Sequence, residues 1–362
     1  MVFAGAFGIA PRGHIRNRVT TVTAKAQLEA AGLSARESDF SEIPQIDLGP
    51  MAGDDPVAKQ ATAKALRDAC VNVGFFYIRN HGLPQQVIDD TFALCPRFFG
   101  LPLEEKMKIH VKKSVNNSGY TPLLEENTDE TALGDLHEGF DMANELPADD
   151  PMARGREALY GANQWPDNLP GFKDQMLTYF EAVKALGRRL FRAFALALDL
   201  PEDYFDPMVT KPTGVLRILS YPSQDGPIDQ RQIGIGAHTD YECFTILGQQ
   251  LGVQALQVQN GRGEWVSAPP IPGTFVVNIG DQMARWTNDV FASTRHRALN
   301  LSGKPRYSMP FFLGTNYDTL IEALPSCVGP DRPAKYPPVI AGEYVLSRFD
   351  ATYAYRQEPK AE

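Results

Sequence analysis

Apolar residues recur at helical spacing through much of the first 200 positions of this chain of 362 residues. Asp55 and Pro56 are typical of a helix start, and Gly74 is typical of a helix end. Further helices are expected at Gln85–Phe99 and Leu103–Ile109. The longest helix is expected from Phe172 to about Leu198, with an apolar stripe that should face a core: Phe172, Met176, Phe180, Val183, Leu190 and Phe194.

Short apolar runs separated by turn residues dominate the chain from Val215 onward. Asn260-Gly261 is typical of a hairpin turn between two of these runs. Many short strands with frequent turns indicate a jelly roll or barrel. Strands are expected at 216–221, 234–238, 244–247, 255–258, 265–268, 274–279, 297–301 and 307–313, and earlier in the chain at 43–48, 75–78 and 136–141.

The expected fold class is therefore α+β, with a double-stranded β-helix (jelly-roll) core, a helical N-terminal region and a supporting long helix. Four regions follow from the pattern. They are an N-terminal extension (1–42), a region of helices and strands (43–170), the long helix with the jelly-roll core (171–315) and a C-terminal segment (316–362).

Composition narrows the class of protein. The net charge is −9 and the pI is near 5.3, which argues against a general nucleic-acid binder. The four cysteines are scattered and are typical of free thiols, and no apolar run reaches the ~20 residues of a membrane helix. We expect a cytoplasmic monomer or weak homo-oligomer. The first 28 residues contain basic but no acidic side chains, so a mitochondrial targeting segment is the alternative.

The strongest chemical pattern is His238-Thr239-Asp240 followed by a distant His296. His238 and Asp240 lie two residues apart, so on an extended backbone they point to the same side. Two imidazoles and one carboxylate on one face of an octahedral ion are the ligand set of a mononuclear non-haem iron(II) oxygenase, and the opposite face stays open for a co-substrate and O₂. His238, Asp240 and His296 are thus the predicted metal-binding and catalytic residues.

Arg306 and Ser308 add a second pattern to the metal ligands. They are also two residues apart and share one face of a predicted strand. A guanidinium fork beside a hydroxyl is a receptor for a carboxylate. A metal triad beside such a receptor suits a 2-oxo-dicarboxylic acid, which would chelate iron at one end and meet Arg306 at the other.

Several segments resemble the iron(II)/2-oxoglutarate-dependent dioxygenases of the isopenicillin N synthase-like family, over residues 43–355. The matching segments are 234–241, 276–281, 285–289, 293–297 and 306–308. The resemblance implies Fe(II), with 2-oxoglutarate and O₂ as co-substrates. It also implies oxidation, usually hydroxylation, of a small organic molecule with release of succinate and CO₂. Tyr221 would add a hydroxyl to the 2-oxoglutarate site, and segment 316–362 would pack on the barrel mouth.

The general layout of the family also suggests residues that touch the substrate. These are Tyr120, His137, Phe140, Phe312 and Asn316, and plain packing is the alternative for each. His81 is expected to make local hydrogen bonds and not to bind metal. Leu219 stands where plant members often carry asparagine, so the polar surroundings of 2-oxoglutarate should be thinner here.

Two other functions remain open at the level of sequence. The same family contains oxidases and oxidative cyclases that use no 2-oxoglutarate, and the Arg-x-Ser pattern occurs in those as well. A non-catalytic binding protein on this fold is the second alternative.

Overall fold

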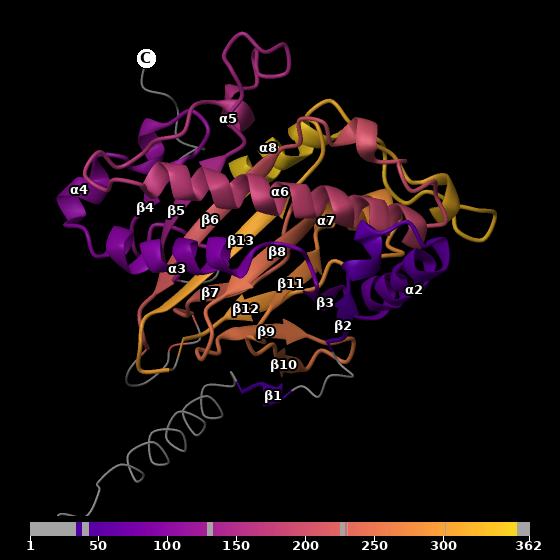
Figure 1. Ribbon diagram of the computed structural model, residues 1–362, viewed down its shortest axis with the longest axis horizontal. Helices are drawn as coiled ribbons and strands as arrows, with labels where there is room; N and C mark the ends of the chain where they lie inside the picture. The colour runs from indigo at the N-terminus through magenta and orange to yellow at the C-terminus, as the bar shows by residue number, and fades with distance from the viewer. Residues whose placement is uncertain are drawn as a thin grey trace, which may run out of the picture.

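The computed structural model describes residues 34–37, 43–128, 133–224, 229, 231–300 and 302–352. Two β-sheets face each other, and helices cover the outer face of the larger one (Figure 1). Most of the N-terminal extension lies outside the described residues, and the targeting alternative lies there too. Within the described ranges, no helix combines the length and the apolar character needed to cross a bilayer.

The larger sheet has eight strands in the order β2-β3-β11-β8-β13-β6-β5-β4. Its strands are β2 (Gln45–Asp47), β3 (Phe75–Arg79), β4 (Gly119–Thr121), β5 (Glu138–Ala143), β6 (Gly214–Tyr221), β8 (Phe244–Gln249), β11 (Thr274–Ile279) and β13 (Arg306–Leu313). The smaller sheet has the order β1-β10-β9-β12-β7. Its strands are β1 (Arg36–Glu37), β7 (Ile235–His238), β9 (Leu256–Gln259), β10 (Trp265–Ser267) and β12 (His296–Ala298). A separate pair joins β14 (Leu320–Ile321) and β15 (Val339–Ile340).

Seven α-helices occur among the described residues. They are α2 (Pro56–Asn72), α3 (Gln85–Phe99), α4 (Leu103–Met107), α5 (Glu157–Tyr160), α6 (Phe172–Ala197), α7 (Asp281–Trp286) and α8 (Ala341–Thr352). The predicted fold class is confirmed, and each predicted strand of the barrel falls within a few residues of an observed one. One local detail differs. The loop after β9 is longer than a two-residue turn, and its left-handed residue is Gly263 at φ +78°, not Gly261.

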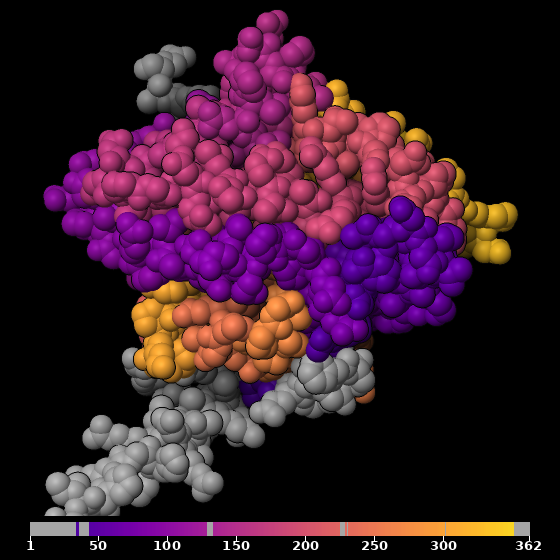
Figure 2. All heavy atoms as spheres, viewed as in Figure 1, coloured from indigo at the N-terminus to yellow at the C-terminus, as the bar shows by residue number. Residues whose placement is uncertain are grey.

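Helix α6 supports the larger sheet along its whole length. All six residues of its predicted stripe are buried. Phe180 meets Phe311 of β13 with ring centroids 5.0 Å apart, and Phe191 meets Phe244 of β8 at 4.9 Å. Each such buried side chain contributes about 1.5–3 kcal/mol to folding. Figure 2 shows the result: α6, α3 and α2 form a continuous surface, and the barrel strands emerge below them.

Side chains alternate along each strand of the larger sheet, so one face packs on the helices and the other faces the smaller sheet. On β13, Phe311 packs on α6, and Tyr307 stacks on Phe99 of α3 with ring centroids 6.1 Å apart. The alternate residues line a cavity between the two sheets: Arg306, Ser308, Pro310 and Phe312. Because the side-chain period of a strand is two, one strand serves both the core and the cavity. The residues with candidate chemistry therefore lie on the side away from the helices.

Candidate active site

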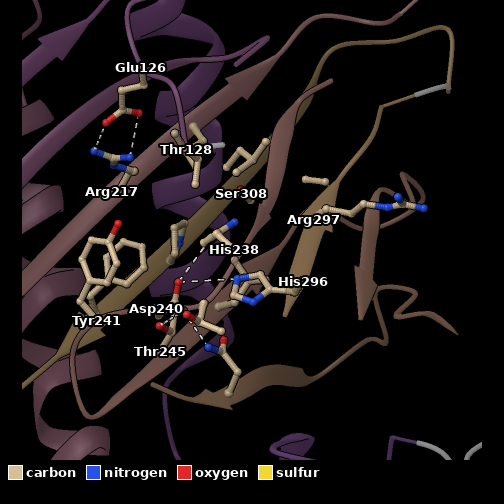
Figure 3. A pocket seen from close by; sticks show the side chains of 18 of the residues that line it. Glu126, Thr128, Arg217, His238, Asp240, Tyr241, Thr245, His296, Arg297 and Ser308 are labelled. Atoms are coloured by element: carbon tan, nitrogen blue, oxygen red, sulfur yellow. Dashed lines mark hydrogen bonds and ion pairs between the residues drawn. The ribbon is translucent and has the colours of Figure 1, made fainter. Parts of the chain in front are cut away.

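The predicted metal ligands meet at one end of the smaller sheet. His238 is the last residue of β7 and His296 the first of β12, and the two residues are opposite each other in the antiparallel pair. Nε2 of His238 lies 3.5 Å from Oδ1 of Asp240, and Nε2 of His296 lies 3.6 Å from the same oxygen. One nitrogen or oxygen from each side chain lies within 4.8 Å of the others (Figure 3). Such a cluster is compact enough to hold one metal ion.

Hydrogen bonds to the backbone orient both imidazoles. Nδ1 of His238 is 2.8 Å from the carbonyl oxygen of Gly236, and Nδ1 of His296 is 3.2 Å from that of Thr294. A carbonyl oxygen only accepts, so each Nδ1 carries the proton. The Nε2 lone pairs therefore remain free and point to the centre of the cluster.

The carboxylate of Asp240 is held in a similar way. Its Oδ2 accepts hydrogen bonds from Thr245 at 2.5 Å and from the amide of Asn278 at 2.7 Å. Its Oδ1, the oxygen that faces both histidines, is left for a metal ion. Sequence reasoning missed Thr245 and Asn278, because their roles depend on strands β8 and β11 lying beside the end of β7.

The charge states of these groups suit a divalent cation. Burial by itself raises the pKa of Asp240, but the two imidazoles and the hydrogen bond from Thr245 outweigh burial and hold that pKa far below its usual range. Burial and the nearby His238 lower the pKa of His296 to about 4. Burial also lowers the pKa of His238, yet the hydrogen bond and charge of Asp240 more than compensate, so the net shift is upward. At neutral pH the site thus presents an ionised carboxylate and a neutral His296, as metal ligands must be.

Arg306 has the features of a receptor for an anion. Its side chain is buried, with 1% of its surface exposed, and among the described residues its Nε and Nη1 have no hydrogen-bond partner. The guanidinium of Arg306 lies over the ring of Tyr221, its partner in the β6–β13 pair, with its central carbon 4.7 Å from the ring centroid. Burial lowers the pKa of Arg306 from its usual value. A buried cation with free donors is costly unless a ligand supplies a partner, and a carboxylate would do so.

The cavity that contains both groups has a volume of about 410 Å³. Leu219, Leu256 and Ala298 contribute apolar walls, so the cavity is apolar at Leu219, as expected from the sequence. Tyr241 and Phe312 line it as well, and Phe349 of helix α8 contributes from the C-terminal segment. The lining thus combines apolar walls with many polar and charged side chains, which can orient a small molecule.

A buried ionic cluster forms part of the cavity wall. Arg217 of β6 donates to Asp141 at 2.6 and 2.9 Å and to Glu126 at 2.8 and 2.9 Å (Figure 3 shows the bonds to Glu126). Glu126 is also 2.8 Å from Nε2 of His137. Burial alone raises the pKa of Glu126, but Arg217 and His137 outweigh it and lower that pKa strongly. Nearby, burial and the charge of Asp240 raise the pKa of Glu242 to about 7.

The structure brings only one of the five predicted substrate residues, Phe312, to the cavity. The prediction is wrong for Phe140 and Tyr120. Phe140 lies on the helix side of β5, 5.1 Å from Phe98 between ring centroids, and it is the next residue, Asp141, that points to Arg217. Tyr120 is buried and donates its hydroxyl to Glu138. Strand alternation explains why Phe140 faces the core.

The prediction is also wrong for His137 and Asn316. Both ring nitrogens of His137 are engaged, by Glu126 and by the carbonyl oxygen of Gly234 at 2.9 Å. Asn316 accepts from the backbone N–H of Lys211 at 2.7 Å and belongs to a loop contact. His81 accepts from the N–H of Leu83, the kind of local hydrogen bond that was predicted.

Sequence reasoning also missed residues that do line the cavity. Arg217 lies four positions before Tyr221 on the same strand, so the two-residue period could have identified it. Glu126 and Thr128 come from a loop without a pattern, and nothing in the sequence points to them.

Comparison with known proteins identifies the family. Residues 43–168 match the family described as non-haem dioxygenase in morphine synthesis N-terminal, and residues 212–315 match the 2OG-Fe(II) oxygenase superfamily. The 2-oxoglutarate-Fe(II) type oxidoreductase hxnY of Emericella nidulans is 36% identical, over 87% of this chain and 93% of that protein. Homoarginine-6-hydroxylase 2-ODD-C23 of Glycine max is 39% identical, over 79% of this chain and 89% of that protein.

A solved structure supports the same assignment. A full-length Neurospora crassa protein, solved in complex with alpha-KG, superposes with a TM-score of 0.76 and 31% identity, covering 85% of this chain and 96% of that one. The fold, the geometry of the histidines and aspartate, and these relatives agree. The chain belongs to the 2-oxoglutarate–Fe(II) oxygenase superfamily and is an iron- and 2-oxoglutarate-dependent oxygenase.

Proposed function

We propose that His238, Asp240 and His296 hold the Fe(II) of this enzyme. The support is that one ligand atom from each of these side chains converges in the cluster. The other polar atom of each side chain is already hydrogen-bonded, to the backbone for the two histidines and to Thr245 and Asn278 for the aspartate. Hydrogen bonds of this kind, from groups behind the ligands, commonly orient metal ligands. With 2-oxoglutarate and O₂, bound iron supplies the oxidant of the reaction.

The 2-oxoglutarate site lies at Arg306 in this proposal. The observation that carries it is the pair of donors, Nε and Nη1, without a partner among the described residues, on a guanidinium that is 1% exposed. The distal carboxylate of 2-oxoglutarate would accept from these donors, and the Ser308 hydroxyl would lie beside it. The ring of Tyr221 packs against the guanidinium at 4.7 Å and helps to hold it in place. Leu219 adds an apolar wall to the same cavity.

The reaction proposed for the rest of the cavity is hydroxylation of a small organic molecule. One oxygen atom of O₂ enters a C–H bond of the substrate, and the other enters succinate as 2-oxoglutarate loses CO₂. A cavity of about 410 Å³ suits a molecule of modest size. Among the relatives, one is named for hydroxylation of homoarginine, and the Neurospora crassa protein has been solved with thymine.

The test is anaerobic reconstitution with Fe(II) followed by 2-oxoglutarate. We expect a weak visible charge-transfer band, formed when the 2-oxo acid chelates iron. His296→Gln should abolish the band, because it removes one metal ligand. His81→Gln is the matched control and should keep it, since the buried His81 ring accepts from the N–H of Leu83 and is not among the residues that line the cavity.

Two outcomes would contradict the proposal. If wild-type protein binds Fe(II) but forms no band with 2-oxoglutarate, the assigned sites are wrong. If His296→Gln binds iron and forms the band as well as the wild type does, His296 is not a ligand.

A further inference from the structure

One carboxylate in the cavity has no cation in contact with it among the described residues. Glu242 lies between β7 and β8, lines the cavity and is 5% exposed. Two of the charged groups near it, Asp240 and Asp281, carry the same sign. A buried carboxyl group that lines a cavity with no cation of the described protein in contact is available to a ligand.

The other glutamates of the cavity are paired. Glu125 contacts Nζ of Lys112 at 2.7 Å and Nε2 of His110 at 2.7 Å. Glu126 contacts Arg217 at 2.8 Å and also His137. These two carboxylates are therefore satisfied by the protein.

Arg217 lines the same cavity, but it is already engaged by two other carboxylates. It donates four hydrogen bonds to Asp141 and Glu126, at 2.6 to 2.9 Å, and none of its recorded hydrogen bonds goes to Glu242. Its positive charge is balanced by Glu126 and Asp141, with which it forms ion pairs. The cavity thus retains one carboxylate for which the described part of the protein supplies no counter-charge in contact.

We propose that Glu242 binds a positively charged nitrogen of the substrate, such as an ammonium, guanidinium or amidinium group. This inference rests on the proposed function, because it assigns the substrate to the same cavity. A charge-assisted hydrogen bond in a buried site is strong and directional. Phe312 and Phe349 line the same space, and aromatic rings favour organic cations. The substrate class is then a small organic cation with an apolar part.

Pairs of small molecules that differ mainly in charge test this inference. Suitable pairs are benzamidine with benzamide and L-arginine with L-citrulline. Dissociation constants are measured by anaerobic calorimetry on the protein loaded with Fe(II) and 2-oxoglutarate. At least one cationic probe should bind about tenfold or more tightly than its neutral counterpart. Glu242→Gln should remove that difference, because the amide keeps the shape and loses the charge.

Glu138→Gln provides the matched control. Glu138 lies on β5, bonded to Lys106 at 2.6 Å and to Tyr120, and it does not line the cavity. The same change of carboxylate to amide there should keep the preference for cations.

Three results would overturn the inference: no preference in the wild type, a preference that survives in Glu242→Gln, or no binding of either cation at millimolar concentration. The visible band in the same samples distinguishes a failure of the proposed function from a failure of the inference about Glu242. A missing band refutes the proposed function together with this inference. A normal band without a preference for cations overturns this inference alone.

Discussion

Two arginines on neighbouring strands face the same cavity and differ in what surrounds them. Arg217 on β6 donates four hydrogen bonds to Asp141 and Glu126. Arg306 on β13 is more deeply buried, yet its Nε and Nη1 have no partner among the described residues. Both side chains are well shielded from water, so the difference lies in whether the protein provides the counter-charge.

The comparison separates a structural charge from a ligand-binding one. Where the protein supplies carboxylates, removing the arginine leaves those carboxylates buried without a cation and lowers the free energy of unfolding. Where the protein supplies none, removing the arginine should change the free energy of unfolding little and should weaken ligand binding strongly. Unsatisfied buried donors are therefore a better guide to a binding site than burial or charge alone. Glu242 is the corresponding anion, because it is buried, lines the same cavity and has no cation in contact among the described residues.

The largest effect is expected for Arg217→Met. Glu126 and Asp141 would be left buried without their cation, and breaking a buried pair in this way costs about 3–5 kcal/mol of unfolding free energy. Urea denaturation measures the loss. Adding Glu126→Gln and Asp141→Asn to the variant should recover much of it. A loss below about 1 kcal/mol for the single variant would mean that the cluster is not a structural element.

Arg306→Leu should behave in the opposite way. We expect the Kd for 2-oxoglutarate to rise about 100- to 1000-fold, because two charge-assisted hydrogen bonds are lost. The unfolding free energy without ligand should change little, since Nε and Nη1 lose no partner in the described part of the protein. Calorimetry with Fe(II)-loaded protein and urea denaturation give the two values. Arg306→Leu with normal affinity would place the carboxylate elsewhere.

A smaller effect is expected for Asn278→Ala. Its amide holds Oδ2 of Asp240, so its loss should weaken Fe(II) binding about 10- to 100-fold. Competition with a chelator measures the affinity. Asn144→Ala is the control, because Asn144 is also buried but bonded to Pro212 and Lys184 away from the metal ligands. If both variants bind iron alike, the hydrogen bond from Asn278 does not matter for the metal.

The smallest effect is a pH dependence at His137. Burial lowers the pKa of His137, but the hydrogen bond and charge of Glu126 outweigh burial and raise it above 6.5. A raised folded-state pKa stabilises the protein fully below the unfolded pKa, and this contribution disappears as pH rises through the folded value.

The stability advantage of wild type over His137→Gln should therefore shrink by about 1 kcal/mol between about pH 5.5 and pH 9. Urea denaturation across that range measures it, and Glu126→Gln should flatten the profile. An advantage that grows with pH would show that His137 is neutral in the folded protein.

Much of the fold and part of the site could be predicted from local patterns. The helical stripe of α6 and the strand alternation of β13 follow from spacing alone, because burial on one face repeats with the period of the element. The same period placed His238 with Asp240 and Arg306 with Ser308, and the residue types pointed to iron and a carboxylate. Phe140 was predicted to touch the substrate, but it packs in the core, and the next residue, Asp141, points to Arg217 in the cavity wall.

The tertiary structure alone decided which charged groups are paired. Arg217 meets Asp141 and Glu126 across separations of 76 and 91 residues, and Asn278 reaches Asp240 across 38. No local pattern reports such contacts, because they depend on which strands become neighbours and on where the loop that carries Glu126 lies. The sequence by itself determined the chemistry that the chain can offer. Folding determined which of those groups the protein satisfies internally and which it leaves for iron, 2-oxoglutarate and the substrate.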